Sequence, residues 1–241
     1  MQRIADVSAE AVLLAGGARA ILLQLANPVV ARGVARHSDF ATRPLDRLHG
    51  TLTYLYVIVY GTPEEIAEVA RRVGAAHRPV RGEGYDARDV DAQLWVAATL
   101  YDTARQVHEL VFGSRWDDAL LADYAVVGGT LGVPPALWPA TQEAFAQYWG
   151  TAALVVGDDA RGVARALLHP SSGPWWLRAA MPTVRMLTAG LLTAELREAY
   201  HLPLDERRFD RWVRRAQFVY PRLPKWVRHA PQRRYLRAFR A

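Results

Sequence analysis

Three residues whose types suit redox chemistry lie in the first third of the chain. Arg47 and Thr51 are four positions apart, and His77 ends a second segment with helical patterning. A spacing of four residues places the arginine and the threonine on one face of a helix. A cation, a hydroxyl and an imidazole that converge between helices could serve a buried redox cofactor, although chance also produces such a pattern.

The neighbours of His77 favour a cofactor ligand over an isolated surface histidine. Arg78 and Arg81 follow it, while Val73 and Val80 make its helix side apolar. A neutral imidazole in this setting could ligate iron, and the guanidinium groups could pair with carboxylates such as haem propionates. A structural histidine that only makes hydrogen bonds fits the same residues, so both interpretations remain open here.

Other kinds of chemical site find little support. The chain has no cysteine, which excludes disulfides, thiolate metal sites, iron–sulfur clusters and cysteine nucleophiles. A di-iron bundle needs two Glu-x-x-His motifs, and only Glu198 to His201 has that spacing. His49 and His108 lie among polar neighbours and are expected at the surface.

The elements that must position these residues are helices. Strand patterns are poor, whereas helix starts and stops are frequent, including Asn27-Pro28, Thr62-Pro63 before Glu65, and Gly113. We expect one all-α domain spanning residues 1–241, a multi-helix bundle with a cofactor buried between helices. One helix is expected to begin at residue 28. Further helices are expected over 44–60, 63–77 and 89–112, and near 138–156, 159–168, 175–200, 205–219 and 232–240.

Charge is concentrated at the end of the chain. Residues 205–241 contain twelve Arg or Lys and three Asp or Glu, a net charge of +9. Aromatic and aliphatic residues interrupt these arginines, as in amphipathic helices that pack on a core. Such helices can also contact anionic lipid, so peripheral membrane contact is a further expectation. No nucleic-acid-binding motif accompanies the charge, and nucleic acid is not an expected partner.

The first ten residues lack the basic and apolar regions of a secretory signal, and no run reaches the roughly 20 apolar residues of a spanning helix. The protein is therefore expected to be cytoplasmic.

Several short phrases, taken in order, resemble the MpaB-type oxygenase family, which includes the catalytic domain of latex-clearing protein, also called rubber oxygenase. The resemblance covers about residues 20–150. The phrases are Leu22-Leu23-Gln24-Leu25-Ala26-Asn27-Pro28, His37-Ser38-Asp39-Phe40, Arg47-Leu48 with Thr51, His77 with Val80-Arg81-Gly82, Leu94-Trp95-Val96-Ala97, and Leu137-Trp138-Pro139.

This resemblance implies an all-α oxidoreductase that binds one haem b, uses dioxygen, and oxidises a hydrophobic, often prenyl-type, small molecule. It implies that His77 is the iron ligand and that Arg47 and Thr51 lie on the other side of the haem; Arg81 remains a candidate partner for a propionate. Two positions depart from the family pattern, since Asn27 and Ala97 stand where histidines are usual. The alternative is a haem-binding protein without turnover, such as a sensor, a carrier or a degenerate paralogue.

Overall fold

The computed structural model describes residues 2–37, 44–171 and 174–241. For residues 44–47 it describes the backbone only. The described residues form one all-α domain, as predicted, and it contains fourteen α-helices. The α-helices are α1 Ile4–Ser8, α2 Gly17–Leu25, α3 Pro28–His37, α4 Pro44–Tyr60, α5 Pro63–His77, α6 Val90–Phe112, α7 Asp118–Thr130, α8 Gln142–Thr151, α9 Asp158–Leu168, α10 Trp175–Leu191, α11 Ala194–Ala199, α12 Glu206–Val219, α13 Lys225–Arg228 and α14 Ala230–Arg240. The remaining elements are the 3-10 helices η1 Ala11–Gly16, η2 Pro135–Leu137 and η3 Tyr220–Arg222, and the strands β1 Arg81–Gly82 and β2 Tyr85–Asp86.

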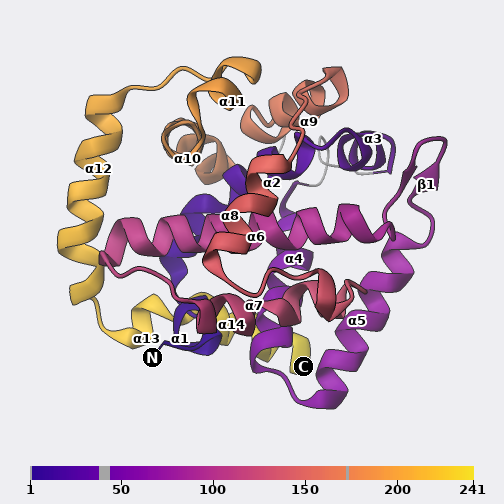
Figure 1. The fold of residues 1–241 in the computed structure, drawn as a ribbon. Helices are drawn as coiled ribbons and strands as arrows, with labels where there is room; N and C mark the ends of the chain where they lie inside the picture. The colour runs from indigo at the N-terminus through magenta and orange to yellow at the C-terminus, as the bar shows by residue number, and fades with distance from the viewer. Residues whose placement is uncertain (1, 38–43, 172–173) are drawn as a thin grey trace.

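Helix α6 is the central rod of the molecule. Figure 1 shows it crossing the middle, with α2 and α10 on one side and α7 and α14 on the other. Asp89 caps its start by accepting a hydrogen bond of 2.9 Å from the Ala92 amide. Gly113 ends it with φ +72°, a left-handed conformation that glycine adopts without strain.

Three groups of buried side chains surround this rod. One fills the space between α4, α6 and α7, and Tyr101 is completely buried in it. A second joins α2, α3, α9 and α11, and a third joins η1, α6, α10 and α12. Trp95 of α6 links the first two groups, since its ring stacks on Trp149 at 5.1 Å and its Nε1 donates 3.0 Å to the Leu23 carbonyl.

Three details differ from the sequence-based expectations. Residues 81–86 form a short hairpin, with Arg81 paired to Asp86 across a turn at Gly84. The helix expected over 175–200 breaks after Leu191, because Leu192 is extended and Thr193 caps a new helix. The expectation that His108 lies at the surface was wrong. Its side chain is buried and accepts a hydrogen bond of 3.2 Å from Trp116 Nε1.

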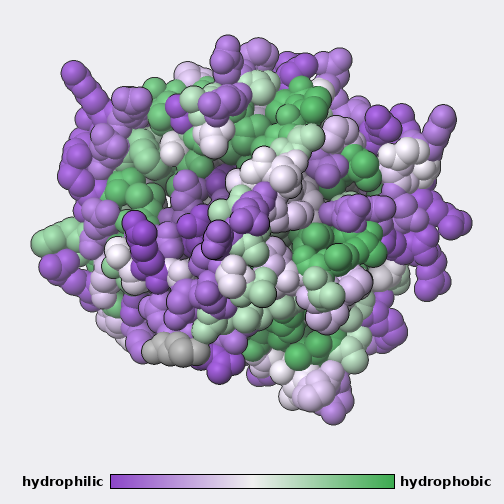
Figure 2. Space-filling view, viewed as in Figure 1, coloured by the Kyte–Doolittle hydropathy of each residue, from purple (hydrophilic) through white to green (hydrophobic). Residues whose placement is uncertain are grey.

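The surface mixes polar and apolar residues, and Figure 2 shows strongly hydrophilic groups along the margin where α12 lies. Within the part of the chain that the structure describes, no single helix is long and apolar enough to cross a membrane. One bent pair, Ala11–Leu25 with Pro28–His37, meets the criteria of length and composition, with an angle of 107° between its halves.

Candidate functional site

A cavity of about 490 Å³ lies between α3, α4, α5, α6 and the hairpin, with α14 at one edge. This volume falls within the range of small-molecule and cofactor sites. Its wall is mostly apolar, including Val30, Val69, Val73 and Val96. A few polar side chains interrupt that wall, and they define the chemistry available to a bound molecule.

His77 is one of these polar groups, and helix α5 brings it to the cavity. Thr62 and Glu65 form a capping box at the start of α5, with Pro63 in the first turn. The helix ends at His77, two residues before Pro79, which cannot continue its hydrogen-bonding pattern. The half-buried imidazole therefore lies at a defined helix end and lines the cavity.

Gln93 fixes the ring of His77 from the neighbouring helix α6. Its Nε2 lies 3.2 Å from His77 Nδ1 and also donates to the carbonyl of Ala87. With the amide in this orientation, Nδ1 is the acceptor. A half-turn of the amide would let Oε1 accept from Nδ1–H, but it would give up the bond to Ala87, because two carbonyl oxygens would then face each other. The sequence analysis missed Gln93, whose only signal is an amide among the apolar residues of α6.

Thr51 lines the same cavity from helix α4, as does Tyr54 one turn later. The Tyr54 hydroxyl donates 2.7 Å to the Val127 carbonyl, and burial raises its pKa, so it stays protonated. The structure thus brings Thr51 and His77 to one cavity. Arg47 belongs to the first turn of α4, but its side chain lies outside the described residues.

Among the described side chains, the cation that lines the cavity is Arg72. Arg81, the predicted candidate, does not line it. Arg81 lies on strand β1 and is exposed, away from the lining. Arg72 lines the cavity, pairs with Glu68 at 2.6 Å and lies 5.1 Å from the centre of the Phe239 ring. Sequence reasoning missed Arg72, because an arginine on an amphipathic helix ordinarily faces solvent.

His37 and Tyr85 form a further polar pair in the lining. His37 Nε2 lies 2.9 Å from the Tyr85 hydroxyl, and the Arg36 guanidinium lies 5.4 Å from the centre of the same ring. The rest of the His37-Ser38-Asp39-Phe40 phrase lies outside the described residues. This pair joins α3 to the hairpin and closes that side of the cavity.

Ala97, by contrast, does not reach the cavity. Val96 and Gln93 line it, whereas Ala97 is fully buried against α7. A Cβ atom added at Gly128 of α7 would lie 3.4 Å from the Ala97 Cβ, so the helices are in close contact there. Helix α7 therefore packs directly on position 97.

Asn27, the other departure, caps α3 as its type predicts. Its Oδ1 accepts a hydrogen bond of 2.9 Å from the Val29 amide.

A smaller apolar chamber of about 150 Å³ adjoins the cavity. Its wall comes from α1, η1, α2, α3, α4, α6 and α7, and includes Leu13, Leu52 and Leu55. Four residues line both spaces: Gln24, Val34, Thr51 and Leu100. We call the smaller, apolar space the side chamber. Thr51 therefore stands between a partly polar cavity and an apolar one.

The polar residues of the cavity fit a cofactor that brings most of its own metal ligands. Within residues 2–37, 44–171 and 174–241, no group of three His, Cys, Asp or Glu side chains could hold a bare metal ion. A porphyrin supplies four nitrogen ligands, so one imidazole suffices as the protein ligand.

Comparison with known proteins agrees with the phrases in the sequence. An uncharacterized protein of Mycobacterium bovis (Mb2261) and one of Mycobacterium tuberculosis (Rv2237) are each 34% identical to this chain over 211 residues, which cover 80% of this chain and 82% of the relative. No solved structure matches the chain. The family model "ER-bound oxygenase mpaB/B'/Rubber oxygenase, catalytic domain" matches residues 5–238. The chain therefore belongs to the family of MpaB-type and rubber oxygenase catalytic domains.

Proposed function

We propose that this protein is a haem b-dependent oxygenase that uses dioxygen to oxidise a hydrophobic small molecule, with prenyl-type chains as the first class to test. The observation that carries the proposal is the position of His77 and Thr51. They come from different helices and line one cavity of about 490 Å³ in a chain of an oxygenase family.

The residues present fit a haem. The apolar walls suit a porphyrin ring, and the imidazole of His77 suits its iron. With its amide turned, at the cost of the bond to the Ala87 carbonyl, Gln93 would hold the ring by accepting from Nδ1–H, as neighbouring groups do for most metal-binding histidines. Arg72, whose side chain is exposed at the edge of the cavity, is suited to a propionate, and Arg81 remains a second candidate.

Thr51 and Arg47 are the proposed catalytic residues. Bound haem would supply the oxygen chemistry that amino-acid side chains lack. The Thr51 hydroxyl can hold a water molecule and pass on a proton. The Arg47 guanidinium, always charged, can donate hydrogen bonds toward an oxygen atom. Apolar walls limit the water that could compete for these donors.

The side chamber supports the hydrophobic character of the substrate. It is lined largely by aliphatic side chains and meets the cavity at Thr51 and Leu100. An apolar chain placed there would be held by burial alone. Its reacting carbon would then lie at the junction, beside the Thr51 hydroxyl.

The second candidate is a haem-binding protein without turnover. It is favoured by Ala97, a methyl group packed against α7 where the family pattern has histidine. No imidazole at this position can transfer a proton, so acid–base work would depend on other groups.

An absorption spectrum of the protein saturated with hemin tests the cofactor. We expect a Soret band that persists through gel filtration, and its loss in His77→Ala. His169→Ala is the control, because His169 is exposed at the end of α9. A wild-type protein that binds no hemin, or a His77→Ala variant with an unchanged spectrum, would contradict the assignment.

Oxygen consumption with prenyl-type test substrates separates the two candidates. The oxygenase hypothesis expects uptake by the haem-loaded protein and a clear loss in Thr51→Val, which removes the hydroxyl with little change of volume. Haem content should stay the same in that variant. Full haem loading with no uptake on any apolar substrate would leave the haem-binding alternative.

A further inference from the structure

The C-terminal helices carry a large excess of unpaired positive charge. Residues 205–241 contain twelve Arg or Lys, and within the described chain only Arg228 and Arg240 have a carboxylate partner, Glu10 at 3.2 Å and Glu65 at 2.7 Å. The other ten are Arg207, Arg208, Arg211, Arg214, Arg215, Arg222, Lys225, Arg233, Arg234 and Arg237. Most of this charge therefore does not serve internal ion pairs.

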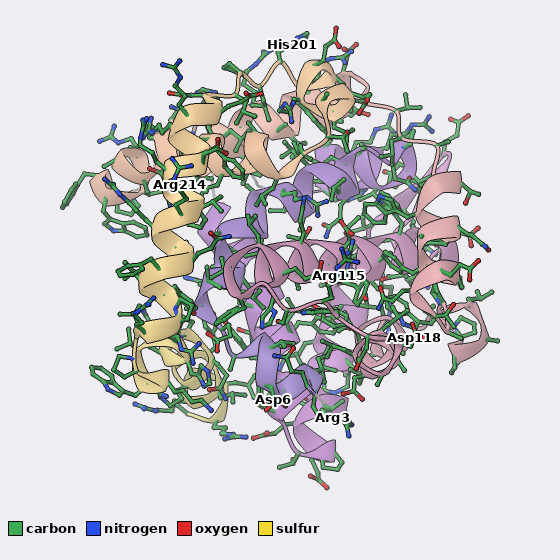
Figure 3. All side chains as sticks on the ribbon, turned by 60° about the vertical axis from the view of Figure 1, so that its left-hand side comes forward. Arg3, Asp6, Arg115, Asp118, His201 and Arg214 are labelled. Atoms are coloured by element: carbon green, nitrogen blue, oxygen red, sulfur yellow. The ribbon has the colours of Figure 1, made fainter. Side chains whose placement is uncertain are left out.

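Helix α12 separates an inward apolar face from an outward basic face. Phe209, Trp212 and Ala216 pack against the core beside α6 and α10. Arg211, Arg214, Arg215 and Phe218 recur at helical spacing and are all exposed. Figure 1 places α12 at the outer margin of the molecule. Figure 3 shows nitrogen-bearing side chains, Arg214 among them, along this helix.

Large apolar side chains are exposed where this basic face ends. Phe218 is 64% exposed, Val219 51% and Trp226 69%. The Arg222 guanidinium lies over the Phe218 ring, 4.1 Å from its centre, so cation and aromatic groups are interleaved. We call Arg211, Arg214, Arg215, Phe218, Val219, Arg222, Lys225 and Trp226 the C-terminal patch.

These exposed groups are held on a fixed frame. The carboxylate of Glu10, which is buried, accepts from the Tyr220 hydroxyl at 3.0 Å and from His229 Nε2 at 3.1 Å, and it pairs with Arg228. These three partners flank Trp226 and follow Phe218 closely in the chain. The contacts with Glu10 therefore anchor the backbone next to the exposed rings of Phe218 and Trp226.

We propose that the C-terminal patch binds the surface of a membrane that contains anionic lipids. Clustered guanidinium groups match lipid phosphates, and each basic residue near such a surface adds to the attraction. Phe218, Val219 and Trp226 can enter the boundary between headgroups and acyl chains, as aromatic residues of interfacial helices do. A nucleic acid would use the charge but would gain little from the exposed valine.

The position of the patch is consistent with a lipophilic ligand. The Val12 amide donates a hydrogen bond of 3.0 Å to the hydroxyl of Tyr220, which follows Val219 of the patch. Helix η1 is therefore bonded directly to the segment that carries the patch. Leu13 and Leu14 of the same short helix line the side chamber, and Leu14 is 39% exposed. One 3-10 helix thus connects the patch to the apolar chamber.

Co-sedimentation of the full chain with vesicles tests the charged part. We expect binding to phosphatidylcholine vesicles that contain about 30 mol% phosphatidylglycerol and little binding to phosphatidylcholine alone. Raising the salt from about 0.05 M to about 0.5 M should release the protein, because screening shortens the range of the attraction. Arg214→Glu with Arg215→Glu should weaken partitioning by roughly 30-fold or more.

A matched control separates the patch from net charge. Arg115→Glu with Arg165→Glu makes the same change in net charge at two exposed arginines on other elements, and Figure 3 places Arg115 away from α12. This control should keep at least half of the binding. Equal loss in both pairs, or equal binding to neutral vesicles, would overturn the proposal.

The apolar part has its own test. Phe218→Ser with Trp226→Ser should weaken binding to anionic vesicles by about tenfold or more, while Val126→Ser with Leu137→Ser, exposed elsewhere, should not. Competition with a short DNA duplex completes the design. If the duplex displaces the vesicles and the serine variants bind them like the wild type, the surface is a nucleic-acid site and the membrane proposal is wrong.

Discussion

At the scale of single residues, one amide helps to orient the imidazole of the site. Gln93 contacts His77 Nδ1 at 3.2 Å and also the Ala87 carbonyl, so it ties the end of α5 to the start of α6. Two nearby polar groups line the same cavity without contacting that ring: Gln24 and Tyr54. Gln93 is therefore one of the groups that orient the ring of His77, whereas Gln24 and Tyr54 are not.

We expect Gln93→Leu to lower hemin affinity by about 10- to 100-fold, the usual effect of removing a group that orients a metal-binding histidine. Gln93→Glu should retain hemin and shift the iron to a more negative reduction potential, because a carboxylate holds the Nδ1 proton and makes the ring more basic. Hemin titration and spectroelectrochemistry measure both quantities.

Gln24→Leu is the matched control for this pair, since Gln24 lines the cavity from α2. It should bind hemin normally. Wild-type affinity in Gln93→Leu would show that the contact with His77 has no part in haem binding.

The residues of the site differ in how far the sequence could predict them. Pro63 and Pro79 bracket the helix that ends at His77. The four-residue spacing from Arg47 to Thr51 predicts that both lie on one face of their helix. Gln93 carries no such local signal, because its contacts are to His77 and to the Ala87 carbonyl. The Glu68–Arg72 pair is local, but only tertiary packing, including the Phe239 ring of α14, brings Arg72 to the cavity.

At the scale of helices, α10 packs against α12 at a glycine. A Cβ atom added at Gly190 would lie in the Phe209 ring, 2.6 Å from its Cγ. Phe209 also packs with Trp212 against the core, so the ring has little room to move. The absence of a side chain at Gly190 thus positions the helix that carries the C-terminal patch.

Gly190→Ala should lower the free energy of unfolding by about 1–3 kcal/mol, since overpacking outweighs the better helix propensity of alanine. Gly162→Ala is the control, because a Cβ atom there meets nothing within 4 Å. That change should stabilise the protein by up to about 1 kcal/mol. Urea denaturation measures both values, and equal stability of the two variants would show that the Phe209 ring moves aside freely.

The helices with local start and stop residues were predicted well, as α5 and α6 show. Thr62 and Asp89 cap them through their own side chains, which is information contained within a few residues. The break at Leu192 and the hairpin at 81–86 were missed, because packing and a turn at Gly84 decide them rather than hydrophobic periodicity.

At the scale of the whole molecule, one buried ion pair joins three helices. Arg19 of α2 donates to Asp102 at 2.6 Å and to Thr103 at 2.7 Å, both on α6, and to the Leu191 carbonyl of α10 at 2.8 Å. Burial lowers the pKa of Arg19, against the effect of Asp102. The sequence could not predict this joint, because its partners lie 83 or more residues apart.

Asp102→Asn should destabilise the fold by about 3–5 kcal/mol, because it leaves the Arg19 charge buried without a counter-charge. Asp158→Asn is the control, since the Asp158 carboxylate is fully exposed and its ion pair with Arg161 is long, at 3.3 Å. Thermal unfolding should show a large fall in Tm for the first variant and almost none for the second. Similar Tm values would mean that the amide oxygen of the substituted side chain, or a water molecule, satisfies the Arg19 guanidinium equally well.

The contacts of Glu10 also set an order of events during synthesis. Its hydroxyl partner Tyr220 is made 210 residues later, and His229 later still. At about 5–20 residues per second, this carboxylate spends roughly 10–40 s on the ribosome before its first partner exists. Helix η1 therefore cannot complete its packing until α12 to α14 have been synthesised, and Val12 and Leu13 remain available to chaperones until then.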